Sequence, residues 1–104
     1  MMSVKENLIA AKALIDTPEK WFKGEYESDN GCLCALGAVA RAVCPKIDFD
    51  EDKIGLYPED GALAEALPFD WPKEVNEIPD FNDAPETTHA DIMALFDRAI
   101  AASS

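Results

Sequence analysis

The sequence predicts a mainly α-helical protein that folds as one small domain over residues 1–104. Three observations support this prediction: apolar residues recur at helical spacing near both ends of the chain, a nearly unbroken apolar run covers residues 31–44, and strand patterns are weak throughout. A chain of 104 residues suits one compact domain and is too short for two. Apolar residues make up 48% of it, enough to build a core.

The first helix is expected from Ser3 to about Ile15. Ser3 and Glu6 have the spacing of a capping box, with the serine at the N-cap and the glutamate at the third helical position. Thr17 and Pro18 then predict a second N-cap and helix start, because proline is favoured at the first helical position. This second helix is expected to be short, to include Trp21 and Phe22, and to end at Gly24.

The central element is expected to be a helix over residues 31–44, capped by Asn30 and stopped by Pro45. Only Arg41 interrupts its apolar surface, which predicts burial on all sides. Most of its residues are small, so neighbouring helices can approach closely.

A long acidic and largely irregular region follows Pro45. Within it we expect a short helix over residues 61–67, closed by Pro68, and brief pairing of residues 47–49 with 54–56. Prolines at 72, 79 and 85 predict extended or turn structure over residues 69–86, with one helical turn near 73–75.

The last helix is predicted to start after Thr88 as N-cap, with Asp91 at the third helical position. Its apolar stripe consists of Ile92, Leu95, Phe96, Ala99 and Ile100.

Charge is divided unevenly along the chain. The chain has 21 acidic and 9 basic residues, for a net charge of −12. Residues 1–47 carry 6 of each sign, whereas residues 48–104 carry 15 acidic and 3 basic residues and therefore the whole net charge. Such a field repels nucleic acid and acidic membranes and attracts basic partners, although solubility alone is the simpler explanation. Basic patches with aromatic residues are absent, so we expect no direct nucleic-acid binding.

The sequence favours a cytoplasmic protein. The N-terminal segment is broken by charged residues, which argues against a signal peptide, and no apolar run has the length of a membrane span. The chain contains three cysteines, and an odd count suits a reduced compartment better than a disulfide framework.

The three cysteines form a poor metal site. Cys32 and Cys34 are separated by one residue and would point about 200° apart on a helix. We therefore expect Cys34 and Cys44 to be core residues. The sharper alternative is a nucleophilic Cys34 at a helix start, with His89 as base and Asn82 or Asp83 orienting it.

The acidic stretch 48–59 partly matches a calcium-binding EF-hand loop. Four carboxylates stand at positions 1, 3, 5 and 12 of that loop, namely Asp48, Asp50, Asp52 and Glu59. Lys53 replaces the turn glycine at position 6, so a solvated acidic loop is the favoured interpretation and a cation site the weaker alternative. We expect no cofactor.

Residues 78–89 allow two interpretations. The first is a structured turn that leads into the last helix, because Asn82 and Asp83 favour turns. The second is a polar recognition patch beside Trp71 or Trp21.

Three features in order resemble a family of small uncharacterised bacterial and phage proteins: Trp21, the Cys-Ala-Leu-Gly-Ala segment 34–38, and the Phe-Asn-Asp segment 81–83 before a C-terminal helix. The resemblance covers about residues 21–101. Phe81 stands where tryptophan is common in that family. The resemblance implies a small helical domain in which Cys34, Asn82 and Asp83 cluster, and it carries no activity.

The sequence thus favours a non-enzymatic acidic interaction protein, encoded by a phage or mobile element. Its partner would be a basic protein surface, including that of a nucleic-acid-binding protein, which it would inhibit by competing with nucleic acid. The alternatives are a small-ligand-binding domain and a cysteine-dependent enzyme centred on Cys34. The candidate binding residues are Asp48, Asp50, Glu51, Asp52, Glu59, Asp60, Asn82 and Asp83.

Overall fold

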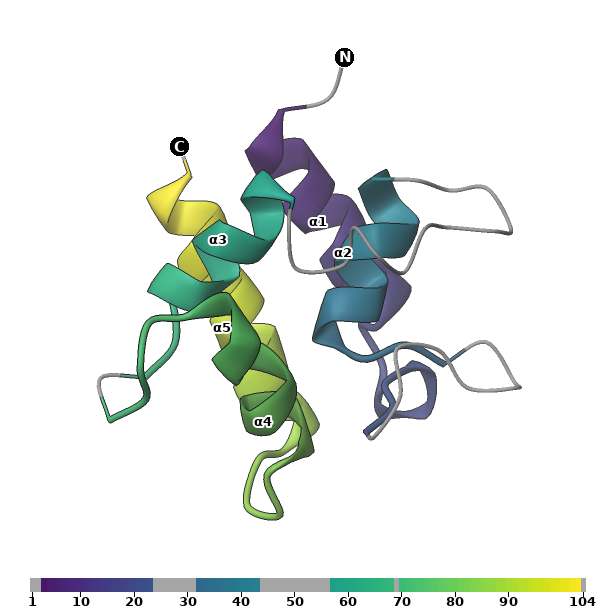
Figure 1. Ribbon diagram of the computed structural model, residues 1–104. Helices are drawn as coiled ribbons and strands as arrows, with labels where there is room; N and C mark the ends of the chain where they lie inside the picture. Colours follow the sequence, from purple (N-terminus) through teal and green to yellow (C-terminus); the bar gives the residue numbers. More distant parts are fainter. Residues whose placement is uncertain (1–2, 24–31, 44–56, 69, 104) are drawn as a thin grey trace.

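The computed structural model describes residues 3–23, 32–43, 57–68 and 70–103, and these form a small all-α domain (Figure 1). The predicted fold class is therefore confirmed. The elements, in chain order, are helix α1 (Val4–Leu14), 3₁₀-helix η1 (Pro18–Lys20), helices α2 (Ala35–Val43) and α3 (Pro58–Glu65), 3₁₀-helix η3 (Val75–Glu77), and helices α4 (Ile78–Asp83) and α5 (His89–Ala102). Extended pairing among the described residues is limited to one isolated parallel bridge between Trp21 and Leu33.

The first and last helices begin where the sequence predicts. In α1 the Ser3 hydroxyl accepts the backbone N–H of Glu6, and the Glu6 carboxylate accepts that of Ser3, both at 3.1 Å. In α5 Thr88 and Asp91 form the same reciprocal pair. Both capping boxes are therefore confirmed.

The prediction of a second helix that includes Trp21 and Phe22 is wrong. In the described part of this segment only the single turn η1 forms, and Trp21, which directly follows it, is extended. The Leu33 N–H donates to the Lys20 carbonyl at 2.8 Å, and the Phe22 N–H donates to the Leu33 carbonyl at 2.9 Å. These bonds join two segments that are adjacent in space.

The same pairing corrects the predicted start of the central helix. Residues 32–34 are extended, so α2 begins at Ala35 rather than at residue 31. Gly24, Asn30, Gly31, Cys44 and Pro45, which were expected to bound the helices here, lie outside the described residues.

Two helices in the acidic half differ from the prediction. Helix α3 starts at Pro58 rather than at residue 61, since proline at the first helical position lacks only an N–H that has no helical partner there. Helix α4 occupies residues 78–83, where turn or extended structure was expected, and Pro79 lies in its first turn. The expected pairing of residues 47–49 with 54–56 lies outside the described residues.

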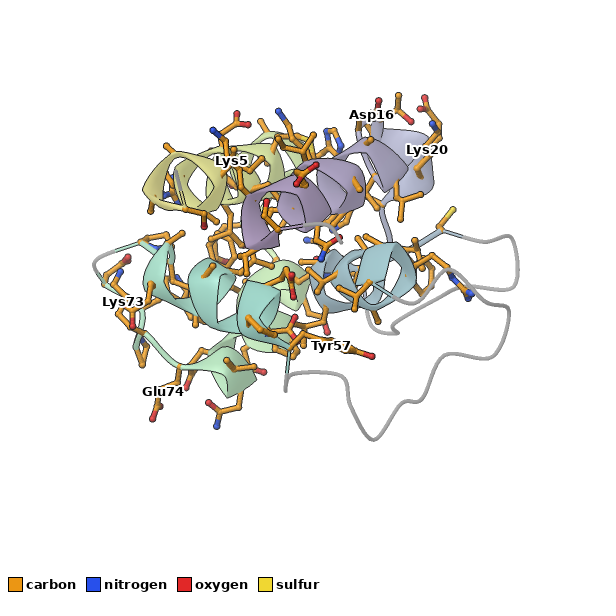
Figure 2. The ribbon with its side chains drawn as sticks, turned by 90° about the horizontal axis from the view of Figure 1, so that it is seen from above. Lys5, Asp16, Lys20, Tyr57, Lys73 and Glu74 are labelled. Atoms are coloured by element: carbon orange, nitrogen blue, oxygen red, sulfur yellow. The ribbon has the colours of Figure 1, made fainter. Side chains whose placement is uncertain are left out.

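The core lies where α1 packs against α2, α3 and α5. Residues 35–40 of α2 are all buried, as its apolar surface predicts, whereas residues 41–43 are only partly buried. On α5, Ile92, Leu95, Phe96 and Ala99 are buried. Viewed from above, charged side chains such as Lys5, Asp16 and Lys20 lie around this core (Figure 2). Within the described ranges no helix is both long and apolar enough to cross a membrane.

Candidate functional site

Asn82, at the end of α4, lies at the centre of a buried polar network. Its side chain is 1% exposed. Its Oδ1 accepts the indole N–H of Trp21 at 2.7 Å and the backbone N–H of Ala35 at 3.1 Å. Its Nδ2 donates to the carbonyl of Phe22 and to Oδ1 of Asp83, both at 3.0 Å.

These four hydrogen bonds use the full capacity of the Asn82 amide, which has two donors and two acceptor lone pairs. The Ala35 N–H is one of the first N–H groups of α2, which have no partner inside their own helix. Asn82 therefore caps α2 and ties it to the segment around Trp21. No capacity remains for a ligand, so we assign Asn82 a structural role.

Cys34 lies beside this network and is 5% exposed. It directly precedes α2: its carbonyl accepts the Ala38 N–H at 2.8 Å, and its sulfur accepts the Gly37 N–H at 3.3 Å. Burial raises the pKa of the Cys34 thiol, and the negative charge of Asp83 adds to this, while backbone N–H groups of Gly37 and Leu36 oppose it. The thiol is thus protonated at neutral pH, the opposite of an activated nucleophile.

The described contacts of His89 are with Ile15 and Trp21. Its Nε2 lies 2.7 Å from the carbonyl oxygen of Ile15, and since a carbonyl only accepts, this nitrogen carries a hydrogen. Its ring packs against Trp21 with a centroid distance of 6.0 Å and an interplanar angle of 55°. Among the described contacts of His89 there is no hydrogen bond to Cys34 or to Asp83.

Glu59 and Asp60 lie in the first turn of α3 and are buried, with exposures of 4% and 0%. Glu59 Oε2 accepts the side-chain N–H of Asn7 at 2.9 Å, and Asp60 Oδ2 accepts the backbone N–H of Tyr57 at 3.1 Å. Glu59 thus differs from the solvated loop expected over residues 48–59, and Asp60, also a candidate binding residue, is buried as well.

The other acidic candidates, Asp48, Asp50, Glu51 and Asp52, lie outside the described residues. Of the four carboxylates in the EF-hand alternative, only Glu59 is described. In the described parts of the chain, no three His, Cys, Asp or Glu side chains are grouped so as to hold a metal ion.

A second acidic region is evident in the structure. We define the acidic segment as residues 70–91, which contain seven acids and one lysine: Asp70, Glu74, Glu77, Asp80, Asp83, Glu86, Asp91 and Lys73. All the acids are exposed except Glu77, which is partly exposed. Glu74, for example, points away from the ribbon (Figure 2).

Acidic residues outnumber basic residues in the acidic segment by seven to one. The ion pairs found among the described residues, Lys12–Asp97 and Lys20–Asp16, lie outside it. The ammonium group of Lys73 donates to backbone carbonyls of Leu67 and Pro68 rather than to a carboxylate. Five acids of the segment form no ion pair with the described residues, namely Asp70, Glu74, Glu77, Asp80 and Glu86.

A hollow of about 300 Å³ opens beside this segment. Trp71 and Phe81 line it, and their rings meet edge to face with centroids 5.3 Å apart. Thr87 also lines it and is 5% exposed. The other charged and polar lining residues are Asp70, Glu86, Asp91 and Arg98.

Comparison with known proteins places the chain in a family. It matches the model of a family of unknown function, DUF6197, over residues 1–102. The chain belongs to this family. No curated protein and no solved structure matches it significantly.

In this member of DUF6197, two neighbouring residues of α4 contact two different sites. Asn82 belongs to the network with Trp21, and Phe81 belongs to the hollow with Trp71. The sequence indicates a polar patch beside Trp71 or Trp21. It does not show that the two tryptophans belong to two different sites. It also does not identify Thr87 or Arg98, because their place in the hollow depends on how α5 packs beside the preceding loop.

Proposed function

We propose that this protein is a non-enzymatic interaction protein that binds a basic protein surface through the acidic segment. The observation that carries this proposal is the set of five carboxylates that have no ion-pair partner among the described residues. Like charges held near one another raise the energy of the free protein. A partner rich in lysine and arginine lowers this energy when it binds, and its positive charge steers it toward the acidic segment.

The proposed surface differs from the one expected from sequence. Glu59, Asp60 and Asn82 are excluded because their side chains are buried and each forms at least one hydrogen bond within the protein. Asp83 is exposed and remains part of it. Basic surfaces of proteins that bind nucleic acid have the required charge, so competition with nucleic acid, and with it an inhibitory role for a phage or mobile-element protein, belongs to the same proposal.

The cysteine-dependent enzyme is the less favoured candidate. Cys34 is buried and its pKa is raised. His89 donates to Ile15 rather than to Cys34 or Asp83. A cysteine nucleophile needs a thiolate and a neighbouring base, and these contacts provide neither.

Hexalysine, with an uncharged fluorophore at its N-terminus and an amidated C-terminus, is the probe that tests the proposal. Its affinity is measured by fluorescence anisotropy in low and high salt. We expect binding at low salt that weakens steeply as salt is added, because the carboxylates are exposed and screened. No binding at low salt, or binding that does not change with salt, would overturn the proposal.

Two double variants of equal net charge locate the binding surface. Glu74→Gln with Asp80→Asn removes two charges from the acidic segment. Glu19→Gln with Glu65→Gln removes two exposed charges outside it. We expect the first variant to bind hexalysine several-fold more weakly than the second. Equal affinities would mean that net charge alone, not this segment, causes the binding.

A further inference from the structure

The hollow beside the acidic segment has the chemistry of a pocket for one arginine side chain. We infer that it receives an arginine of the basic partner, an inference that rests on the proposed function. Three independent features support it: a hydroxyl without a hydrogen-bond partner among the described residues, an aromatic wall and an excess of carboxylates.

The hydroxyl is that of Thr87. The residue is about as buried as a core residue, with 5% exposure. Its backbone N–H donates to the Ala84 carbonyl at 3.0 Å, but its side chain forms no hydrogen bond with the described residues. The hydroxyl oxygen is not fully enclosed by protein, so it keeps access to solvent. Thr87 lines the hollow. In the free protein this hydroxyl is therefore left to water, and a ligand that donates a hydrogen bond here replaces that water.

The aromatic wall consists of Trp71 and Phe81. Trp71 is partly exposed and held by its edge-to-face contact with Phe81. A cation over an aromatic ring is attracted by the charge distribution of the ring, and the planar guanidinium group of arginine stacks on such rings.

Carboxylates outnumber cations around the hollow. Asp70, Glu86 and Asp91 line it together with one cation, Arg98. Arg98 donates its Nε–H to the Ala66 carbonyl at 2.8 Å, a bond that holds it to the end of α3. Asp91 uses one carboxylate oxygen for the Thr88 N–H at 2.9 Å, and its other oxygen forms no hydrogen bond with the described residues.

These features favour arginine over lysine and over a neutral ligand. A guanidinium has five N–H donors in a planar fork, so it can donate to Thr87 and to a carboxylate while stacking on Trp71. An ammonium group is a compact point charge that gains less from an aromatic wall. An apolar ligand would leave the Thr87 hydroxyl and the carboxylates without partners.

A comparison of hexaarginine with hexalysine tests the inference, because the two peptides have equal charge. We expect hexaarginine to bind several-fold more tightly. In ¹H–¹⁵N spectra it should shift the indole N–H signal of Trp71. The indole N–H of Trp21 is the internal control, because it is bonded to Asn82 outside the hollow and should not move.

Thr87→Val tests the hydroxyl, because valine keeps the shape of the side chain and removes the polar atom. We expect hexaarginine binding to weaken about tenfold, as for a lost hydrogen bond to a charged group, while hexalysine binding stays unchanged. Thr17→Val is the matched control, since Thr17 makes no side-chain capping bond and lies outside the hollow. Urea unfolding of each variant verifies that it is folded.

The possible outcomes separate the two proposals. If neither peptide binds at low salt, the proposed function fails and the arginine pocket fails with it. If both peptides bind equally, if the Trp71 signal does not move, or if Thr87→Val leaves hexaarginine binding unchanged, the pocket is overturned while the proposed function stands.

Discussion

The network around Asn82 and the hollow beside Trp71 differ in how their polar groups are satisfied. In the network, all four hydrogen-bonding positions of the Asn82 side chain are filled by protein groups. In the hollow, the Thr87 hydroxyl and the carboxylates of Asp70 and Glu86 have no hydrogen-bond or ion-pair partner among the described residues. Asn82 of α4 belongs to the network, and the preceding residue, Phe81, lines the hollow.

This difference separates a role in folding from a role in binding. A closed network stabilises the folded chain, because breaking it leaves buried donors unpaired at about 1–3 kcal/mol each. An open site contributes little to folding, so its polar groups are better explained by a partner. Substitutions in the network should therefore change stability, and those in the hollow should change binding.

The largest expected effect is that of Asn82→Ala. It removes the acceptor for both the Trp21 indole and the Ala35 N–H, and the donor to the Phe22 carbonyl. We expect a loss of about 3 kcal/mol or more in the free energy of unfolding, from two or three buried groups left unpaired. Urea unfolding measures it.

Asn76→Ala is the matched control, since Asn76 is exposed in η3. Its effect should stay within about 0.5 kcal/mol, as for surface substitutions in general. If the two alanine variants were equally stable, the network would not hold the fold.

The Asn82 network also marks the limit of what the sequence predicts. The two capping boxes involve residues three positions apart, so local spacing is enough to find them. The cap of α2 is supplied by Asn82, 47 residues beyond Ala35 in the chain. No local pattern contains that partner.

The other differences have similar causes. Residues 32–34, predicted to belong to the central helix, lie outside α2 because the backbone of Leu33 pairs with the segment around Trp21. Helix α4 was missed because Pro79 suggests a helix break, whereas proline in a first turn leaves no helical hydrogen bond unmade. The resemblance implied that Cys34, Asn82 and Asp83 cluster; in the structure Asn82 bonds to Asp83 and to the N–H of Ala35, the residue after Cys34.

Cys34 should react slowly with iodoacetamide. In a chain that keeps only this cysteine, through Cys32→Ser and Cys44→Ser, burial and the raised pKa both suppress the thiolate. At pH 8, below its ordinary pKa of 9.0, we expect the native protein to react at least about tenfold more slowly than the urea-unfolded chain. Mass spectrometry over time measures both rates. A native rate equal to or above the unfolded one would restore the nucleophile hypothesis.

A smaller effect is expected for Thr88→Ala. The Thr88 hydroxyl accepts the Asp91 N–H at 3.3 Å at the start of α5. Loss of such an N-cap costs about 1 kcal/mol of stability. The midpoint of urea unfolding should fall, with an unchanged dependence on urea. An unchanged midpoint would show that water replaces this cap without loss.

Thr87→Val, at the residue directly before Thr88, is expected to have the smallest effect on stability. The hydroxyl of Thr87 forms no hydrogen bond with the described residues, so its removal leaves no protein group unpaired. We expect the free energy of unfolding to change by no more than about 0.5 kcal/mol, although the residue is buried. A loss above about 1 kcal/mol would instead give this hydroxyl a structural role like that of Thr88. With the small change that we expect, the two neighbouring threonines differ in the way that the network and the hollow differ: Thr88 stabilises the fold, and Thr87 offers a polar group to a partner.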